Sequence, residues 1–324
     1  MRRRGFLRVL GGAAAAWPLA ARAQTPSKIP HVGVLDFFSS AASAEFLISF
    51  HEGLRELGHR DGQNISVEYH SAEQRSERAA DLAADFVRRK VDVIVAVATP
   101  AAHAAKQATA SIPIVITVAD PLATGLVSNL ARPGGNITGM STTATDLAGK
   151  RLELLRELRP DTARIAFLGA TNDPNTRTFV RETAAAATSL GVQLQPVLVT
   201  GPDEFEAAFA TMVKERADGL IVQPLFLGHR EKLTELALRA RIPMIADQPQ
   251  FAASGALATY GSDRRRAHKR LAWYIDRILN GVKPADLPIE QPTQFHLAIN
   301  TRTAKALGLT VPSKLLFTAD EVID

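Results

Sequence analysis

Cysteine is absent from the 324 residues of this chain. Its absence excludes disulfide bonds, thiolate metal sites, cysteine nucleophiles and the lipid-carrying cysteine of a bacterial lipoprotein. Aromatic residues make up only 6% of the sequence, whereas 46% of it is hydrophobic, much of that alanine, valine, isoleucine and leucine. This composition is typical of a globular α/β protein that is long enough for two lobes of ordinary size.

Acidic residues are absent from the first 23 positions, which contain five arginines. The formal net charge of the whole chain is +5 at pH 7, so without this segment it is 5 − 5 = 0. A nucleic-acid-binding protein carries a basic surface on its folded part. We therefore expect no nucleic-acid partner, and we interpret the charge run at 263–266, with His268, Lys269 and Arg270, as a solvated helix face or a helix cap.

Long hydrophobic runs are also missing. The apolar stretch at 9–20 has 12 residues and is interrupted by Gly11, Gly12 and Pro18, whereas a membrane span needs about 20. A basic start precedes it, and the small-x-small sequence Ala21-Arg22-Ala23 follows it, as in a secretory signal.

We predict that residues 1–23 are a signal peptide cleaved after Ala23. Arg3 and Arg4 fit the twin-arginine pattern, with Sec export as the alternative. The mature protein is then expected to be a soluble, monomeric periplasmic protein without stable membrane insertion.

From residue 31 onward, short apolar runs alternate with longer amphipathic ones, which is typical of strands and crossover helices in parallel sheets. The first half has predicted strands at 31–35, 65–69, 91–97 and 114–118, with helices at 43–57, 76–89 and 100–108. The glycine-rich stretch 132–139 is interpreted as a turn. After it come helices at 146–158, 176–190, 204–214 and 230–239, and strands at 164–168, 193–199, 219–222 and 243–246.

The two halves follow the same order, which favours a structural repeat. We predict two doubly wound parallel-sheet α/β lobes joined by a hinge. The N-terminal lobe comprises 28–142 plus about 263–287, and the C-terminal lobe comprises 143–262 plus about 288–324. A helix at 265–279 ends at Asn280-Gly281, and Pro284, Pro288 and Pro292 then keep a connector between the lobes extended.

Ligands of open parallel sheets bind beyond the carboxyl ends of the strands, where loops meet helix N-termini. The loops at these ends supply the candidate ligand-binding residues, which are Asp36, Phe37, Phe38, Ser39, Thr99, Pro100, Ala101, Asp120, Pro121, Asn172, Asn175, Gln223, Phe226, Asp247, Gln248 and Phe251. The four phenylalanines in this set suit the walls of a pocket for an apolar or aromatic ligand, although any one of them could instead belong to the core.

Two of these loops allow two interpretations each. Thr99 is a good cap for a helix whose next residue is Pro100, so the helix N-terminus could hold a ligand carboxylate or could simply be a capped end. Asp120 could pair with a ligand amino group or cap the turn before Pro121.

Motifs of enzymes are weak in this chain. The stretch 134–139 lacks the lysine and hydroxyl of a P-loop, and no serine stands in a nucleophile elbow. The eight histidines have no helical pair with zinc-site spacing and are interpreted as surface residues. We therefore expect no catalytic residues, no metal and no cofactor.

The sequence resembles the ABC-transporter substrate-binding family, whose characterised members include tryptophan- and tyrosine-type binding proteins with the type I periplasmic-binding fold. The segments that carry the resemblance are 91–102, 119–121, 132–139, 255–261, 281–288 and 303–309. The family implies Venus-flytrap closure around a small ligand, which is delivered to a membrane permease driven by a cytoplasmic ATPase.

The loops of the family match at Thr99-Pro100 and Asp120-Pro121. The sequence 223–226 differs from the Pro-Thr-Asp-type loop of the family, so the ligand class stays open between an amino acid and an aromatic or other organic acid. Two alternative functions remain. The protein could be a sensory receptor for a membrane signalling partner, or an exported enzyme on the same scaffold.

Overall fold

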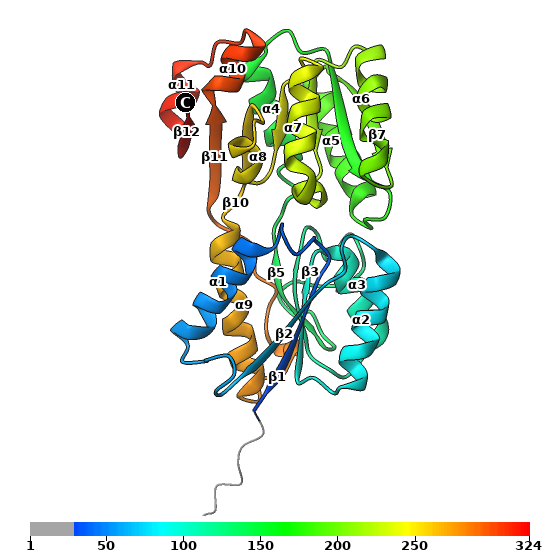
Figure 1. The fold of residues 1–324 in the computed structure, drawn as a ribbon, viewed down its shortest axis with the longest axis vertical. Helices are drawn as coiled ribbons and strands as arrows, with labels where there is room; N and C mark the ends of the chain where they lie inside the picture. The colour runs from blue at the N-terminus through cyan, green and yellow to red at the C-terminus, as the bar shows by residue number, and fades with distance from the viewer. Residues whose placement is uncertain (1–28) are drawn as a thin grey trace, which may run out of the picture.

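The computed structural model describes residues 29–324 and shows two α/β lobes stacked along the long axis of the molecule (Figure 1). The predicted signal peptide, with Arg3, Arg4 and the cleavage site after Ala23, lies outside the described residues. Among the helices of residues 29–324, none combines the length and the apolar character needed to cross a bilayer.

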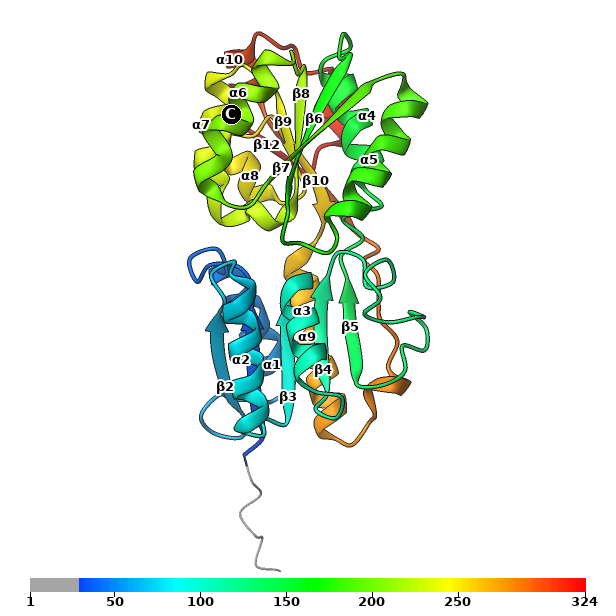
Figure 2. The same ribbon diagram turned by 90° about the vertical axis from the view of Figure 1, so that its right-hand side faces the viewer.

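The N-terminal lobe is a five-stranded parallel sheet in the order β2-β1-β3-β4-β5. Its elements are β1 (His31–Asp36), α1 (Ala44–Glu56), β2 (Ser66–Ser71), α2 (Ser76–Arg88), β3 (Val93–Val97), α3 (Thr99–Ala108), β4 (Ile114–Val118), β5 (Ile137–Ser141), α9 (Arg264–Leu279) and the 3₁₀ turn η3 (Pro284–Asp286). Helices α2 and α3 lie together on one face of the sheet, and α1 and α9 lie together on the other (Figures 1 and 2). Strands β3, β4 and β5 are buried throughout, and β3 and β4 have the nearly continuous apolar sequences typical of such strands.

The C-terminal lobe has a seven-stranded sheet in the order β12-β11-β10-β9-β8-β6-β7. Its elements are α4 (Ala148–Leu158), β6 (Arg164–Ala170), α5 (Thr176–Leu190), β7 (Gln193–Val199), η1 (Pro202–Glu204), α6 (Phe205–Lys214), β8 (Gly219–Val222), η2 (Pro224–His229), α7 (Arg230–Arg239), β9 (Met244–Ala246), α8 (Pro249–Ala253), β10 (Ala258–Ser262), β11 (Phe295–Asn300), α10 (Thr301–Leu307), α11 (Ser313–Thr318) and β12 (Glu321–Ile323). The strand order β7-β6-β8-β9-β10 repeats that of β2-β1-β3-β4-β5, which confirms the predicted structural repeat.

Two sequence predictions about the sheets were wrong in part. The glycine-rich stretch predicted as a turn ends in a fifth strand, β5, paired with β4. Gly139 has φ +135°, and a Cβ there would overlap the backbone of Ile116, so only glycine fits this close approach. The second sheet is not purely parallel, because β11 is antiparallel to β10. Strand β10 runs toward the N-terminal lobe, and β11 returns from it, so the two neighbours must have opposite directions.

The chain passes between the lobes at three connections, which are β5 to α4, β10 to α9 and η3 to β11. The carboxyl ends of the parallel strands of both sheets point to the space between the lobes (Figure 2). Loops from both lobes therefore meet there, and they build the site described next.

Candidate ligand-binding cleft

A cavity of about 890 Å³ lies between the lobes. Its walls come from loops at the carboxyl ends of both sheets and from the first turns of α1, α3 and α9. This volume lies within the range of small-molecule binding sites. Of the predicted site residues, Asp36, Phe38, Thr99 and Gln248 line the cavity.

The remaining predicted site residues do not line the cavity, although several are next to lining residues in the chain. They are Phe37, Ser39, Pro100, Ala101, Asp120, Pro121, Asn172, Asn175, Gln223, Phe226, Asp247 and Phe251. Phe37, Phe226 and Phe251 are buried in the core, and Phe226 packs edge-on against Phe205 with ring centroids 5.3 Å apart. The aromatic lining comes instead from Phe38, Phe46, Phe179 and Phe295.

Asp36 is the buried carboxyl group of the N-terminal wall. Its Oδ1 accepts a hydrogen bond from the backbone N–H of Phe38 at 2.9 Å, and its Oδ2 accepts one from the hydroxyl of Tyr69 at 3.4 Å. Burial raises the pKa of Asp36 to about 7, because no cation offsets the loss of water around the carboxylate. This side chain is therefore partly protonated near neutral pH.

The N-terminus of α3 is built differently from the prediction. The residue before the helix is Ala98, held at φ 71°, and the Thr99 side chain makes no capping hydrogen bond. The Thr99 hydroxyl oxygen instead accepts a hydrogen bond of 2.5 Å from Nδ2 of Asn175 in the other lobe. The predicted cap is thus a contact between the lobes.

Asp173 is the buried carboxyl group of the opposite wall, and sequence analysis missed it although its loop was a candidate. Its Oδ1 accepts the N–H of Asn175 at 2.9 Å, and its Oδ2 accepts Nε2 of Gln223 at 2.6 Å. Oε1 of Gln223 in turn accepts the N–H of Ala170 and the hydroxyl of Thr176. Burial raises the pKa of Asp173 to about 6. Gln223 thus positions the wall without lining the cavity.

Asp120 caps a turn, which was one of its two predicted roles. Its Oδ1 accepts hydrogen bonds from the N–H groups of Leu122 and Ala123 at 3.0 and 2.9 Å. The cavity does not include it. The alternative role, a partner for a ligand amino group, has no support in this geometry.

The lobes touch at the edge of the cleft formed by β2 and η2. Nε2 of Gln74 donates to the backbone carbonyl of Leu225 at 3.1 Å, and the backbone carbonyl of Gln74 accepts a hydrogen bond from Nδ2 of Asn172 at 3.2 Å. Gln250 of α8 donates to the carboxylate of Glu45 of α1. These contacts hold the two lobes together around the cavity.

The start of α9 forms the hinge end of the cavity, and its sequence was interpreted as a solvated face or a helix cap. Asp263 does cap α9, since its Oδ1 accepts the N–H of Arg266 at 3.2 Å. Arg264 and His268, one helical turn apart, line the cavity instead of facing solvent. Nη2 of Arg264 lies 2.5 Å from Oδ2 of Asp247.

His268 contradicts the prediction that the histidines are surface residues. It is partly buried and packs against Phe46, with ring centroids 5.0 Å apart. Burial and the nearby Arg264 lower its pKa to about 3, so the ring is neutral at physiological pH.

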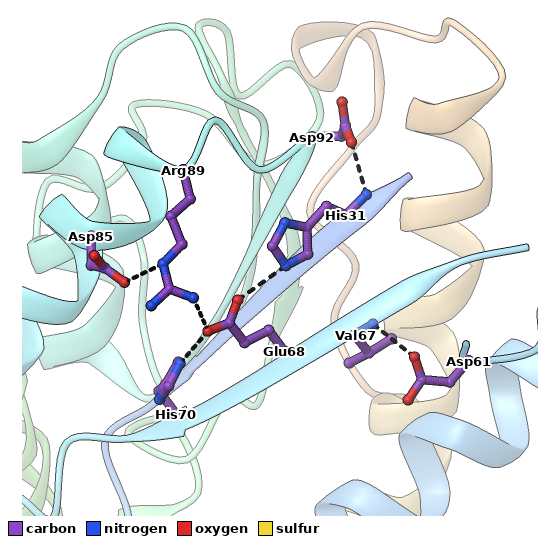
Figure 3. A network of polar contacts seen from close by, with 8 residues as sticks. All are labelled: His31, Asp61, Val67, Glu68, His70, Asp85, Arg89 and Asp92. Carbon is purple, nitrogen blue, oxygen red and sulfur yellow. Dashed lines mark hydrogen bonds and ion pairs between the residues drawn. The ribbon is translucent and has the colours of Figure 1, made fainter. Parts of the chain in front are cut away.

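Two histidines lie away from the cleft, His31 on β1 and His70 on β2 (Figure 3). There the Glu68 carboxylate is paired with His31 at 3.1 Å, with His70 at 2.6 Å and with Arg89. This network links β1, β2 and α2, and its side chains are not part of the cavity.

Comparisons with known proteins agree with this architecture. The model of a family described as ABC transporter substrate binding protein matches residues 31–323. A tyrosine-binding protein of Clostridioides difficile (strain R20291) is 30% identical over 263 residues, which are 80% of this chain and 75% of the relative.

Two solved structures of similar sequence identity differ in how well they superpose on this chain. The ABC domain from Streptococcus pneumoniae in complex with L-Trp has a TM-score of 0.85 at 26% identity, covering 91% of this chain and 99% of that one. The ligand-free, open structure of CD0873, a substrate binding protein from Clostridium difficile, has a TM-score of 0.66 at 28% identity, with the same coverage. The better match to the ligand-bound structure accords with the contacts between the lobes. This chain belongs to the ABC transporter substrate binding protein family.

Proposed function

We propose that the protein captures a small organic ligand between its lobes in the periplasm and delivers it to an ABC permease that a cytoplasmic ATPase drives. The observation that carries this proposal is the cavity of about 890 Å³, whose polar and aromatic lining comes from both lobes. A ligand in such a cavity contacts both walls at once and so favours the closed arrangement over an open one. The closed, loaded form is the one that a permease would recognise.

The ligand class is an amino acid with an aromatic side chain, or an aromatic or other organic acid. Relatives that bind tyrosine and tryptophan support this proposal. The N-terminus of α3 would hold the ligand carboxylate, since its first-turn N–H groups have no acceptors within the helix. Phe38, Phe46, Phe179 and Phe295 would surround an apolar part of the ligand.

The two buried carboxyl groups, Asp36 and Asp173, face the ligand from opposite lobes. A ligand ammonium group would stabilise their ionised forms and would lower both pKa values. Binding of an amino acid would then release protons.

Thermal unfolding of the mature protein, from Gln24 onward, tests the proposal. We expect L-tyrosine, L-tryptophan or an aromatic acid to raise the unfolding temperature in a concentration-dependent way. At a ligand concentration one hundred times the dissociation constant, the free energy of unfolding should increase by about 2.7 kcal/mol. The ligand should be recovered chemically unchanged after denaturation, because a binding protein does not convert it. A converted ligand would instead indicate an enzyme.

A further inference from the structure

The charged groups that line the cavity are almost all satisfied by the protein itself. Asp36 and Asp173 accept hydrogen bonds on both oxygens, as described above. The other charged lining residues are paired with protein groups as well, namely Glu45 with Gln250, Asp263 with the N–H of Arg266, Arg265 with Glu52, and Asp320 with the N–H of Leu297. Arg264 is different. Within residues 29–324, its guanidinium makes one hydrogen bond to the protein, through Nη2 to Asp247, and the residue lines the cavity.

The surroundings of Arg264 carry an excess of positive charge. Behind the Arg264–Asp247 pair lies Arg151 of α4, whose side chain is fully buried. Nε of Arg151 donates to the Tyr260 carbonyl at 2.8 Å and Nη1 donates to the Ala144 carbonyl at 2.9 Å, so both bonds go to neutral acceptors. Burial lowers the pKa of Arg151 to about 10, and Asp247 and Arg264 both act on it, but the group is still a cation at neutral pH.

Asp247 forms an ion pair with Arg264 and acts on Arg151 electrostatically without a hydrogen bond. The three groups together therefore carry a net charge of +1 in a largely buried cluster. His268, one helical turn from Arg264, is neutral and therefore does not change the net charge of the cluster. Two polar atoms of the cluster, Nη2 of Arg151 and Oδ1 of Asp247, are buried without a hydrogen-bond partner among the described residues. Buried charge without compensation is costly, and an anion at the open side of Arg264 would relieve that cost.

We propose that Arg264, backed by Asp247 and Arg151, is a subsite for an acidic group of the ligand at the hinge end of the cleft. This inference rests on the proposed function and narrows its substrate class. Because the N-terminus of α3 is available for one carboxylate, a second acidic group at Arg264 selects dicarboxylic ligands, such as acidic amino acids or aromatic diacids. A planar guanidinium with several free donors can bind both oxygens of a carboxylate, which the ammonium group of a lysine does less well.

The experiment measures dissociation constants by isothermal titration calorimetry for pairs of ligands that differ only in one acidic group. The pairs are terephthalate with terephthalamate, and L-glutamate with L-glutamine. We expect at least one acid to bind about tenfold or more tightly than its amide. We expect Arg264→Gln to reduce this ratio to less than about threefold.

Arg266→Gln is the matched control, since Arg266 lies two residues further along α9, outside the cavity, and donates to the side chain of Gln294. It should keep the wild-type ratio. If Arg264→Gln does not fold, the double variant Arg264→Gln with Asp247→Asn removes the pair without leaving a lone buried carboxylate. It should show the same loss of discrimination. A purely structural role at the hinge would weaken acid and amide equally, which would overturn the inference.

Two further outcomes distinguish a failure of the anion subsite from a failure of the proposed function. If L-tyrosine or L-tryptophan binds but no acid binds better than its amide, the anion subsite is wrong and the proposed function stands. If neither these amino acids nor any member of the two pairs binds, the proposed function is contradicted together with the inference.

Discussion

The amide Nδ2 of Asn175 donates a hydrogen bond of 2.5 Å to the hydroxyl oxygen of Thr99, and these two residues belong to different lobes. Both are buried, so water does not compete for the bond. It can form only when the lobes are close together. The bond therefore contributes to the stability of the closed arrangement and not to that of either lobe alone.

Asn175→Ala is expected to weaken ligand binding about fivefold to tenfold, which corresponds to the net contribution of about 1 kcal/mol from one hydrogen bond. Asn175 does not line the cavity, so the change would act through closure. Titration calorimetry with the ligand found by thermal unfolding measures the effect. Asn64→Ala, in an exposed turn of the N-terminal lobe, is the control. Unchanged affinity in Asn175→Ala would show that the bond does not contribute to closure.

Gln74→Ala should shift the ligand-free protein toward an open form. Gln74 follows β2, the strand at the sheet edge opposite β5 and its connection to the other lobe. The hydrogen bond that its side chain donates to the Leu225 carbonyl therefore acts far from that connection, and Gln74→Ala removes it. Small-angle X-ray scattering would show a larger radius of gyration than for the wild type. Gln63→Ala, at an exposed position of the same lobe, should leave the radius unchanged. Equal radii in wild type and Gln74→Ala would contradict this role.

The buried carboxyl group of Asp36 predicts a specific pH dependence of stability. It ionises near pH 3.8 when exposed and near 7 in the folded protein, so the folded state binds more protons between these values. Its contribution is therefore present below about pH 4 and is lost as the pH rises through 7. Asp36→Asn should remove this loss and stabilise the protein at pH 8 by at most about 4 kcal/mol, from about 1.4 kcal/mol per pH unit.

Urea unfolding at several pH values between 4 and 8 measures this effect. Asp81→Asn, on an exposed position of α2, is the control and should leave the pH profile unchanged. An Asp36→Asn profile as steep as that of the wild type would mean that other groups cause the pH dependence.

Gly139→Ala is expected to destabilise the N-terminal lobe by about 3 kcal/mol or more. Its φ of +135° is a conformation that side chains rarely adopt, and the added methyl group would overlap the Ile116 backbone in β4. Gly134→Ala is the matched control. It also has a positive φ, +69°, but open space around it, so its cost should be only about 1 kcal/mol. Thermal unfolding compares the two, and equal costs would contradict the packing argument.

The sequence predicted most elements because buried parallel strands and amphipathic crossover helices have clear periodicities. Strand β5 was missed because its sequence, which includes Thr138, Gly139 and Ser141, has no apolar run. Strands β10 and β11 and the short helices α8, α10 and α11 were not predicted either. The antiparallel direction of β11 depends on where the chain re-enters the lobe. Periodicity within one segment carries no such information.

The cavity lies at the edge of both sheets that the sequence predicted for the site, but only part of its lining was among the predicted residues. Asp36 and Phe38 line the cavity, whereas Phe37 is fully buried in the core. The chain bends directly after β1, so the sequence did not indicate which of the two phenylalanines faces the cavity. Arg264 and His268 are four residues apart on one face of α9, a spacing that was visible in the sequence. Which face of α9 meets the cavity depends on the packing of α9 on α1, and this required the structure.

The position of α9 has a consequence for synthesis of the protein. This helix covers one face of the N-terminal sheet together with α1, and it contacts β3, β4 and β5. The ribosome makes all of β6 to β10 after β5 and before α9. The lobe that is begun first is therefore completed only after most of the other has been translated, so the usual order in which an N-terminal domain folds first does not apply.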